Sequence, residues 1–428
     1  MCIRDRYSVA LQAYKAASNA RSLKIGYIHV HNTPVQADFS AAPNIGIAPL
    51  KVQFSDLSTG APSSWAWYFG DEDFSADWSQ AAGSADWAAR YDHSSVVMPD
   101  GSIVLMGGSD GFWSWTNDVW RSIDGGETWT QMTAHADWLP RIGHSSVVLA
   151  DGSILLMGGY DAYGAENDVW RSTDHGATWS LVTDSAAWPG RNSHNSLVLP
   201  DGSIVVMGGF LNNGNYTGDV WRSIDNGASW DQMTASAGWS ARARFSSVAL
   251  ADGTILVMGG LISGGHENDV WRSTDSGATW VQVTADADWA ERGYHTSVVL
   301  PDGSVVLVGG YDTSLFYNDA WRSTDNGATW SQLAGSVSGT ARYSHTSVVL
   351  PDGRIVVMGG VDSSYQFLND VWQLETAGSN LENPEYTYVS PGIYNVFLSA
   401  SGPDSVDMEV KTDYINVIYG VILPLFFR

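Results

Sequence analysis

Residues 90–129 read RYDHSSVVMPDGSIVLMGGSDGFWSWTNDVWRSIDGGETW. This stretch holds an apolar run after His93, an Asp100-Gly101 pair, and a second apolar run that ends at Gly107-Gly108; an Asn-Asp-Val-Trp segment follows. An Asp-Gly pair between two alternating apolar runs is a strong signal for a tight hairpin. The stretch therefore predicts four short strands, at 93–98, 102–106, 117–122 and 128–132.

The same pattern occurs six times with a period of about 50 residues. The second glycine of the pair stands at Gly108, Gly159, Gly209, Gly260, Gly310 and Gly360, and the tryptophan that follows stands at Trp120, Trp170, Trp221, Trp271, Trp321 and Trp372. Four short strands in a repeat of this length form one blade of a β-propeller. The chain is therefore predicted to be all-β, with a six-bladed propeller of four-stranded blades.

The ring is expected to close through a strand from the N-terminal side. The last strand of a unit is missing after Trp372, but residues 77–80 and 85–90 match the end of a unit at 279–282 and 287–292. An N-terminal strand around Trp78 would complete the last blade and remove an exposed sheet edge. The two ends of the propeller would then be adjacent, so that the propeller could sit within a loop of another domain.

These repeats resemble known families over residues 77–374. The Gly-Gly pair, the Asn-Asp-Val-Trp segment and the Arg-x-x-His that precedes the first strand resemble kelch repeats. The turn Ser-x-Asp-x-Gly-x-Thr-Trp resembles the Asp-box of BNR repeats. It occurs at Ser122–Trp129, Ser172–Trp179, Ser223–Trp230, Ser273–Trp280 and Ser323–Trp330, with Ser229 in place of threonine in the third.

The flanking segments resemble the two halves of a PKD domain, which is an Ig-like β-sandwich. Trp65–Asp71 resembles its Trp-x-Phe-Gly-Asp-Gly signature, although Glu72 replaces the final glycine, and residues 383–417 resemble the second half. Tyr7–Val30 aligns without gaps onto Tyr394–Val417 and so resembles part of a second PKD domain. The resemblance implies an archaeal or bacterial PKD-containing surface protein with a propeller nested in a PKD sandwich.

The expected domain organisation follows the repeats and the flanks. It comprises a non-native leader at 1–6, the C-terminal half of a truncated PKD domain at 7–32, a discontinuous PKD domain at 33–72 and 379–419, the kelch-like propeller at 73–378, and a tail at 420–428.

Composition excludes some functions. The net charge is −25, and the chain has four lysines, Lys15, Lys24, Lys51 and Lys411. A nucleic-acid binder needs the opposite sign. The apolar run 417–427 is too short for a membrane-spanning helix, so we expect no membrane insertion.

The repeated polar residues invite catalytic interpretations that we do not favour. Histidines stand at one position of five units, at His93, His144, His194, His295 and His345, but Phe245 takes that position in the fourth unit. One residue per blade also spreads around a ring instead of converging on a metal. Galactose oxidase chemistry would need a cysteine in the propeller, and the only cysteine is Cys2. Arginines recur in every unit, unlike the few unrepeated arginines of a sialidase site. We expect no catalytic residue, no metal site and no cofactor, and structural calcium is left open.

Ligands are expected on the face where the sequence stops repeating, because loops on a rigid ring carry recognition. The predicted ligand-binding residues are Tyr91, Asp92, Phe112, Trp113, Trp115, Tyr163, Asn192, Tyr216, Arg244, Tyr294, Phe316, Tyr343 and Tyr365. Aromatic side chains there suit sugar faces or a protein anchor. The expected function is a non-catalytic extracellular or cell-surface binding or adhesion protein with PKD spacers. An extracellular, sialidase-like, glycan-active enzyme is the alternative. The identity of the ligand and the oligomeric state are left open.

Overall fold

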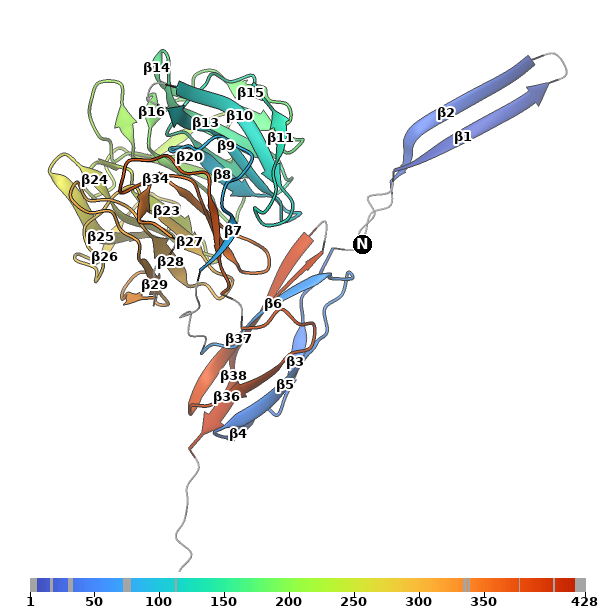
Figure 1. The fold of residues 1–428 in the computed structure, drawn as a ribbon, viewed down its shortest axis with the longest axis vertical. Coiled ribbons are helices and arrows are strands. Elements are labelled where there is room, and N and C mark those ends of the chain that lie inside the picture. Colours follow the sequence, from blue (N-terminus) through green and yellow to red (C-terminus); the bar gives the residue numbers. More distant parts are fainter. Residues whose placement is uncertain are drawn as a thin grey trace, which may run out of the picture. The chain divides into compact units, whose positions relative to one another are not determined.

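The computed structural model describes residues 6–15, 18–29, 34–71, 78–111, 114–333, 337, 339–376, 378–402 and 405–419. The chain divides into two compact units, one formed by residues 1–71 with 378–428 and the other by residues 72–377. Both are built from β-strands (Figure 1). No helix in the described part of the chain is long and apolar enough to span a bilayer. The predicted leader, apart from Arg6, and the tail at 420–428 lie outside the described residues.

The larger unit consists of antiparallel sheets of four strands, one of which has a fifth strand. In chain order, the first two sheets are β8 (Ser94–Val97), β9 (Ile103–Gly111), β10 (Ser114–Ser122) and β11 (Thr130–Thr133), and then β12 (Ser145–Val148), β13 (Ile154–Asp161), β14 (Gly164–Ser172) and β15 (Ser180–Thr183). The next two are β17 (Asn195–Val198), β18 (Ile204–Met207), β20 (Val220–Ser223) and β21 (Asp231–Thr234), and then β23 (Ser246–Ala249), β24 (Ile255–Ile262), β25 (Gly265–Ser273) and β26 (Val281–Thr284), with β22 (Arg242–Ala243) as the fifth strand, paired with β24. The last two are β27 (Thr296–Val299), β28 (Val305–Val308), β29 (Ala320–Ser323) and β30 (Ser331–Gln332), and then β32 (Thr346–Val349), β33 (Ile355–Met358), β35 (Val371–Leu374) and β7 (Ser79–Ala82). The predicted all-β class and four-stranded sheets are confirmed.

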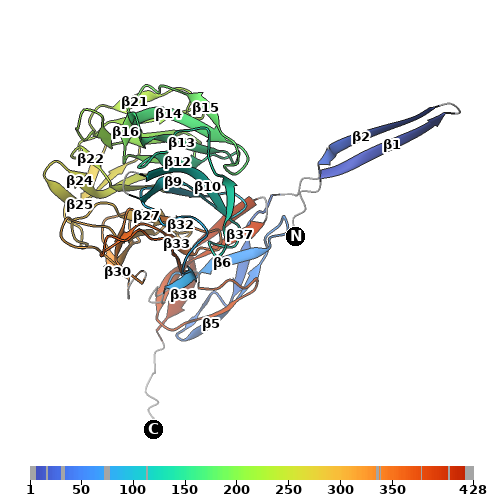
Figure 2. The same ribbon diagram turned by 45° about the horizontal axis from the view of Figure 1, so that its top comes forward.

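The first strands of the sheets form a closed ring. Each of β8, β12, β17, β23, β27 and β32 contacts the next in this order, and β32 contacts β8 (Figure 2). Two short pairs of strands are separate from these sheets, β16 (Arg191–Asn192) with β19 (Phe210–Leu211) and β31 (Arg342–Tyr343) with β34 (Val361–Asp362). Sheets arranged around an axis in this way are those of a β-propeller.

The sheet of β32 contains a strand from the far end of the unit. β7 pairs with β35, with Trp372 opposite Gln80. The Asn369 amide donates to the carbonyl oxygens of Ala85 and Trp87, at 3.1 and 3.2 Å. In the first sheet Asn117 makes the equivalent bonds within continuous chain. The strand expected around Trp78 therefore lies at the outer edge of this sheet.

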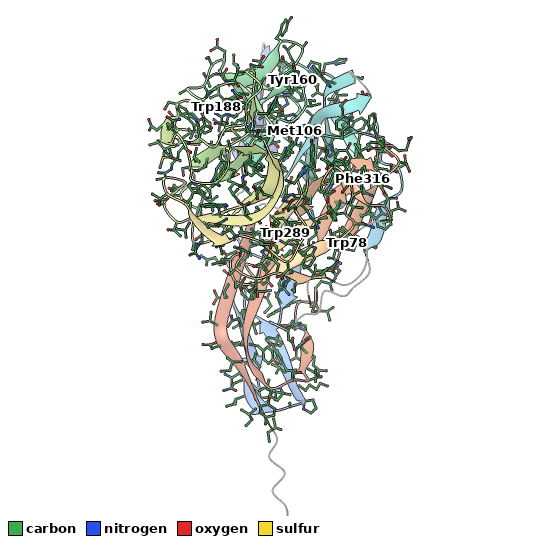
Figure 3. The ribbon with its side chains drawn as sticks, turned by 90° about the vertical axis from the view of Figure 1, so that its left-hand side faces the viewer. Trp78, Met106, Tyr160, Trp188, Trp289 and Phe316 are labelled. Atoms are coloured by element: carbon green, nitrogen blue, oxygen red, sulfur yellow. The ribbon has the colours of Figure 1, made fainter. Side chains whose placement is uncertain are left out.

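Apolar contacts between neighbouring sheets form the core of the propeller. The first four residues of the second strand in each sheet are fully buried, as at Ile103–Met106. A tryptophan from the loop before each of the first five sheets packs edge-on against a tryptophan of the turn before the fourth strand, for example Trp87 and Trp129 at 5.9 Å and Trp188 and Trp230 at 6.0 Å. Trp188 and Trp289 are buried within the unit (Figure 3). Edge-to-face aromatic pairs stabilise the folded state beyond the contribution of the surface area that they bury.

Each repeat also contains a buried arginine bound to an aspartate. The Arg90 guanidinium donates to both carboxylate oxygens of Asp118, at 2.7 and 2.9 Å, and to the Gly107 carbonyl oxygen at 2.9 Å. The equivalent pairs are Arg141–Asp168, Arg191–Asp219, Arg242–Asp269, Arg292–Asp319 and Arg342–Asp370. Paired, bidentate geometry is what makes a buried guanidinium tolerable. The arginine, the Gly-Gly pair and the aspartate of the sequence repeat thus form one structural motif.

The turn before the fourth strand is held by its own polar residues. In the first sheet, Thr128 donates through its amide and its hydroxyl to Asp124, and the Gly126 amide donates to the Ser122 hydroxyl. The four later turns repeat this pattern. Their aspartates therefore serve local structure.

The smaller unit has two sheets that share a core. One contains β3 (Phe39–Ala42), β5 (Leu50–Asp56) and β36 (Glu385–Tyr388), and the other contains β4 (Ile45–Ile47), β38 (Ser405–Ile418), β37 (Gly392–Gly402) and β6 (Ser64–Tyr68). Phe39, Phe54, Trp67 and Leu398 are fully buried between them. Strands distant in sequence therefore build this core jointly.

A separate hairpin is formed by β1 (Arg6–Lys15) and β2 (Ser18–His29). It pairs Tyr7 with Ile28 and Val9 with Lys24, with a register shift between them. The hairpin of β37 and β38 pairs Tyr394 with Ile415 and Val396 with Lys411, with the same shift. The gapless alignment of the two segments thus corresponds to a shared strand register.

Removing the buried arginine of one repeat tests its role. We expect Arg191→Ala to lower the free energy of unfolding by about 3–5 kcal/mol, because Asp219 is then left buried without its partner. Arg222→Ala is the matched control, since Arg222 pairs with the half-exposed Asp201 at the edge of the same sheet and its loss should cost about 1 kcal/mol or less. Urea unfolding measures both. Equal costs for the two variants would contradict this role.

Candidate binding site at the loop face of the propeller

A ring of six residues surrounds the axis at the loop face, where the chain enters the first strand of each sheet. We call Asp92, Gly143, Ser193, Arg244, Tyr294 and Ser344 the collar; each stands two residues after the buried arginine of its repeat. All six have left-handed backbones with φ between 53° and 60°. This conformation is costly for residues other than glycine, so the surrounding structure must enforce it.

Backbone hydrogen bonds close the collar into a ring. The amide of each member donates to the carbonyl oxygen of the member before it, over distances of 2.7–3.2 Å: Gly143 to Asp92, Ser193 to Gly143, Arg244 to Ser193, Tyr294 to Arg244, Ser344 to Tyr294 and Asp92 to Ser344. Every repeat therefore contributes one donor and one acceptor. The backbone conformation is shared by all six residues, whereas their side chains vary.

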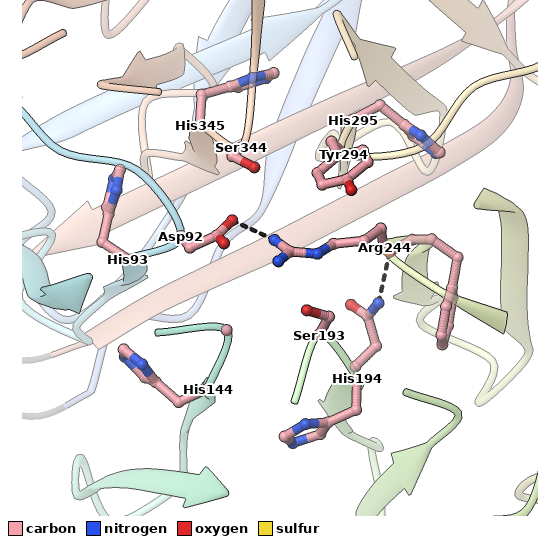
Figure 4. A pocket seen from close by; sticks show the side chains of 13 residues that line it. Asp92, His93, His144, Ser193, His194, Arg244, Tyr294, His295, Ser344 and His345 are labelled. Carbon is pink, nitrogen blue, oxygen red and sulfur yellow. Dashed lines mark hydrogen bonds and ion pairs between the residues drawn. The ribbon is translucent and has the colours of Figure 1, made fainter. Parts of the chain in front are cut away.

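The collar side chains surround a cavity of about 140 Å³ (Figure 4). Asp92 accepts a hydrogen bond from Arg244 within it. These residues precede β8 and β23, which stand opposite each other in the ring of six first strands, so their ion pair crosses the axis of the ring. We call this end of the axis, at the loop face, the mouth of the channel. The Arg244 guanidinium lies 4.7 Å from the centre of the Tyr294 ring, a cation–π distance. The Ser344 hydroxyl is buried and has no hydrogen-bond partner among the described residues.

Histidines form the wall beneath the collar. The Nε2 atoms of His144 and His194 lie 2.9 and 2.8 Å from the hydroxyls of Ser94 and Ser145 in the preceding sheet. Burial and the neighbouring arginine lower the pKa of His144, His194, His295 and His345 to about 3, and the pKa of His93 also lies well below its ordinary value. These imidazoles are therefore neutral at pH 7.

Further down the axis, a cavity of about 200 Å³ is lined by serine and threonine hydroxyls of the first strands. The hydroxyls of Ser95, Ser146, Ser196, Ser247 and Ser347 have no partner among the described residues. Such a polar cavity is suited to ordered water. Within the described ranges, no group of three or more His, Cys, Asp or Glu side chains is placed to hold a metal ion.

Aromatic side chains gather on one side of the mouth. Tyr343 packs against Tyr294 at 5.4 Å and stacks on Tyr311 at 5.3 Å, and Phe316 contacts Tyr311 at 4.8 Å and Tyr365 at 5.4 Å. We call these five residues the aromatic cluster. Tyr365 is 59% exposed, and Leu315 beside Phe316 is exposed to the same degree. The cluster joins the cavity through Tyr294, which lines it.

The predicted site residues divide into four groups. Asp92, Arg244 and Tyr294 line the cavity, and Phe316, Tyr343 and Tyr365 belong to the aromatic cluster. Tyr91, Trp115, Tyr163, Asn192 and Tyr216 do not line the cavity; Trp115 packs on Tyr160, Tyr216 on Phe210, and Tyr91 on Phe367. Phe112 and Trp113 lie outside the described residues.

Other members of the site were missed. Ser193 and Ser344 occupy collar positions, but small hydroxyl residues carried no signal on their own. Tyr311 follows its Gly-Gly pair, where Tyr160 and Phe210 also stand, and it was not among the predicted residues. The position two residues after each buried arginine could have identified the collar.

Acidic side chains at the loop face mainly accept hydrogen bonds from their own loops. Asp312 accepts from the amides of Ser314 and Leu315 and from the Tyr317 hydroxyl, and Asp362 accepts from the amides of Ser364 and Gln366. Burial and the neighbouring carboxylate of Asp161 raise the pKa of Glu166. Asp161 itself accepts from the Tyr163 amide.

One family of known proteins is similar to this chain. The family profile described as the KLHDC2/KLHL20/DRC7 Kelch-repeats domain matches residues 64–260 and 177–360. The chain belongs to this kelch-repeat family. The two overlapping matches cover more than half of the chain, and they extend over the sheets that carry the collar. No curated protein matches the chain.

The histidine wall of this kelch domain predicts acid sensitivity. A histidine whose pKa falls from an ordinary 6.5 to about 3 on folding stabilises the protein above pH 6.5, and this contribution is lost as the pH falls below 6.5. Between pH 8 and pH 5 we expect each such histidine to remove about 2 kcal/mol of unfolding free energy. His194→Phe, which copies Phe245, should reduce the loss by this amount in urea unfolding at the two pH values. An unchanged pH dependence would contradict the neutral, buried state of His194.

Proposed function

We propose that this kelch protein is a non-catalytic binding or adhesion protein whose ligand, a glycan or a protein, docks on the collar and the aromatic cluster. The observation that carries the proposal is the convergence of unrepeated side chains at the mouth of the channel. Asp92, Arg244 and Tyr294 come from different repeats and meet at one cavity. A concave site with a few oriented polar groups beside aromatic rings is a common form of ligand site.

The roles of the repeated charges favour binding over catalysis. The six buried arginines are bound to structural aspartates, as Arg90 is to Asp118, so they are not open to a substrate carboxylate. Asp124 and its equivalents in the four later turns accept hydrogen bonds from their own turns. A sialidase-like mechanism would need unrepeated acidic groups facing one pocket, and Asp92, the acid that lines the cavity, is bound to Arg244.

We also propose the arrangement and location that go with such a function. The larger unit would be a six-bladed propeller with Asp-box turns of the BNR type, nested in a PKD-type β-sandwich formed by the smaller unit. The PKD-type segments would act as spacers that display the propeller outside the cell. Support comes from the Trp65–Asp71 signature, from the strand register shared by β1–β2 and β37–β38, and from the acidic composition.

A substitution in the aromatic cluster tests the docking surface. Glycans and proteins would be screened for binding to the intact chain, and the affinity of each hit would then be measured for two variants. We expect Tyr365→Ala to weaken binding about tenfold, because an exposed ring at the edge of the mouth is lost. Tyr163→Ala is the control, since Tyr163 is 85% exposed but lines neither the cavity nor the cluster, and it should bind like the parent. Equal binding by parent and Tyr365→Ala would refute this surface.

A further inference from the structure

We infer that the collar cavity binds a neutral sugar residue through Asp92, Arg244 and Ser344, with the aromatic cluster against the apolar face of the sugar. This inference rests on the proposed binding function and names its ligand class. The cavity carries no net charge. Asp92 and Arg244 are the two charged residues that line it, and they neutralise each other.

The ion pair argues against a charged ligand. An anion would have to compete with Asp92 for Arg244, and Asp92, whose side chain is 4% exposed, would lose its counter-ion. A cationic group would in turn leave Arg244 without its partner. Removing one member of a buried pair is strongly unfavourable. A neutral ligand leaves the pair intact.

Hydrogen-bonding capacity at the mouth remains unused. The structure assigns the Arg244 side chain one hydrogen bond, from Nη1 to Oδ1 of Asp92, among the described residues. The Asp92 Oδ2 acceptor and the Arg244 Nε and Nη2 donors are therefore available at the cavity. The buried Ser344 hydroxyl adds a group that both donates and accepts and has no partner in the described part of the chain.

This set of groups matches the edge of a sugar ring. A sugar hydroxyl donates one hydrogen bond and accepts others, so neighbouring hydroxyls can donate to Asp92 Oδ2 and accept from Arg244 and Ser344 at the same time. A buried Ser344 hydroxyl without a partner carries a desolvation cost that such a ligand would relieve.

The aromatic cluster supplies the second element of sugar recognition. Tyr294 is common to the cavity and the cluster, and the Tyr343 ring lies 5.4 Å from it. A pyranose ring has one face of C–H groups, which packs on flat aromatic side chains by apolar contact. The polar edge and the apolar face of one sugar residue could therefore be satisfied together. A cavity of about 140 Å³ admits a single residue or its edge, not a longer chain.

The test is a titration of the intact chain with neutral oligosaccharides of galacto, gluco and manno configuration and with matched sialylated and uronic-acid-containing oligosaccharides. The wild-type protein should bind a neutral member, and the dissociation constant should not change when salt is added, because no net charge is paired. Preference for the acidic oligosaccharides, or no binding to any member, would overturn the inference.

Two variants and a control locate the site. Asp92→Asn should weaken neutral binding about tenfold or more and create affinity for the acidic oligosaccharides, because Arg244 then lacks a counter-ion. Ser344→Ala, which leaves the ion pair in place, should weaken neutral binding a few-fold and create no acidic binding. Arg322→Gln removes a similarly buried ion pair, with Asp302, at the Asp-Gly turn, and should leave binding unchanged. Thermal melting verifies that each variant folds.

The outcomes separate this inference from the function on which it rests. If the protein binds no sugar but binds a basic protein in a salt-sensitive manner, and Tyr365→Ala weakens that binding, the ligand class is wrong and the docking surface stands. If neutral sugars bind and Asp92→Asn and Ser344→Ala both bind like the wild type, sugars bind elsewhere and the collar assignment is wrong.

Discussion

The buried arginine of each repeat is the contact on which the propeller and its candidate site both depend. Its guanidinium joins three parts of a repeat: the aspartate of the third strand, the carbonyl of the first glycine in the Gly-Gly pair, and the loop that carries the arginine itself, as Arg90 does with Asp118, Gly107 and Ala88. A buried charge of this kind is tolerated only when all its hydrogen bonds are made. The repeat therefore has to keep all of these parts together.

The collar follows from this contact at a fixed distance along the chain. The arginine holds the loop, and two residues later the backbone turns left-handed and bonds to the equivalent residue of the preceding repeat. Six such bonds form a closed ring, so no collar residue can change conformation without breaking bonds to two neighbours. Strain at non-glycine positions such as Tyr294 is thus offset by cooperative hydrogen bonding. The result is a rigid frame in which side-chain identity is free to vary.

This separation between frame and side chains explains what could be predicted from the sequence. The fold was predictable because arginine, Gly-Gly and Asp-x-Trp recur every 50 residues or so, and each has one structural task. Asp92, Arg244 and Tyr294 could be named because they break the repeat near the mouth. The ion pair between Asp92 and Arg244 could not be predicted, because it joins residues 152 positions apart in the sequence and follows only from ring closure. Ser344 was invisible because the chain contains many serines, and its unpaired state is a property of burial.

The most direct test of this account is backbone hydrogen exchange at the collar amides. The amides of Asp92, Gly143, Ser193, Arg244, Tyr294 and Ser344 are in loop segments at the mouth of a channel, yet each donates within the ring. We predict that they exchange as slowly as amides of the buried strand β9, because opening one bond requires the frame to open. Exchange at the rate of unprotected loop amides would show that no closed ring exists and would remove the rigid frame on which the binding site depends.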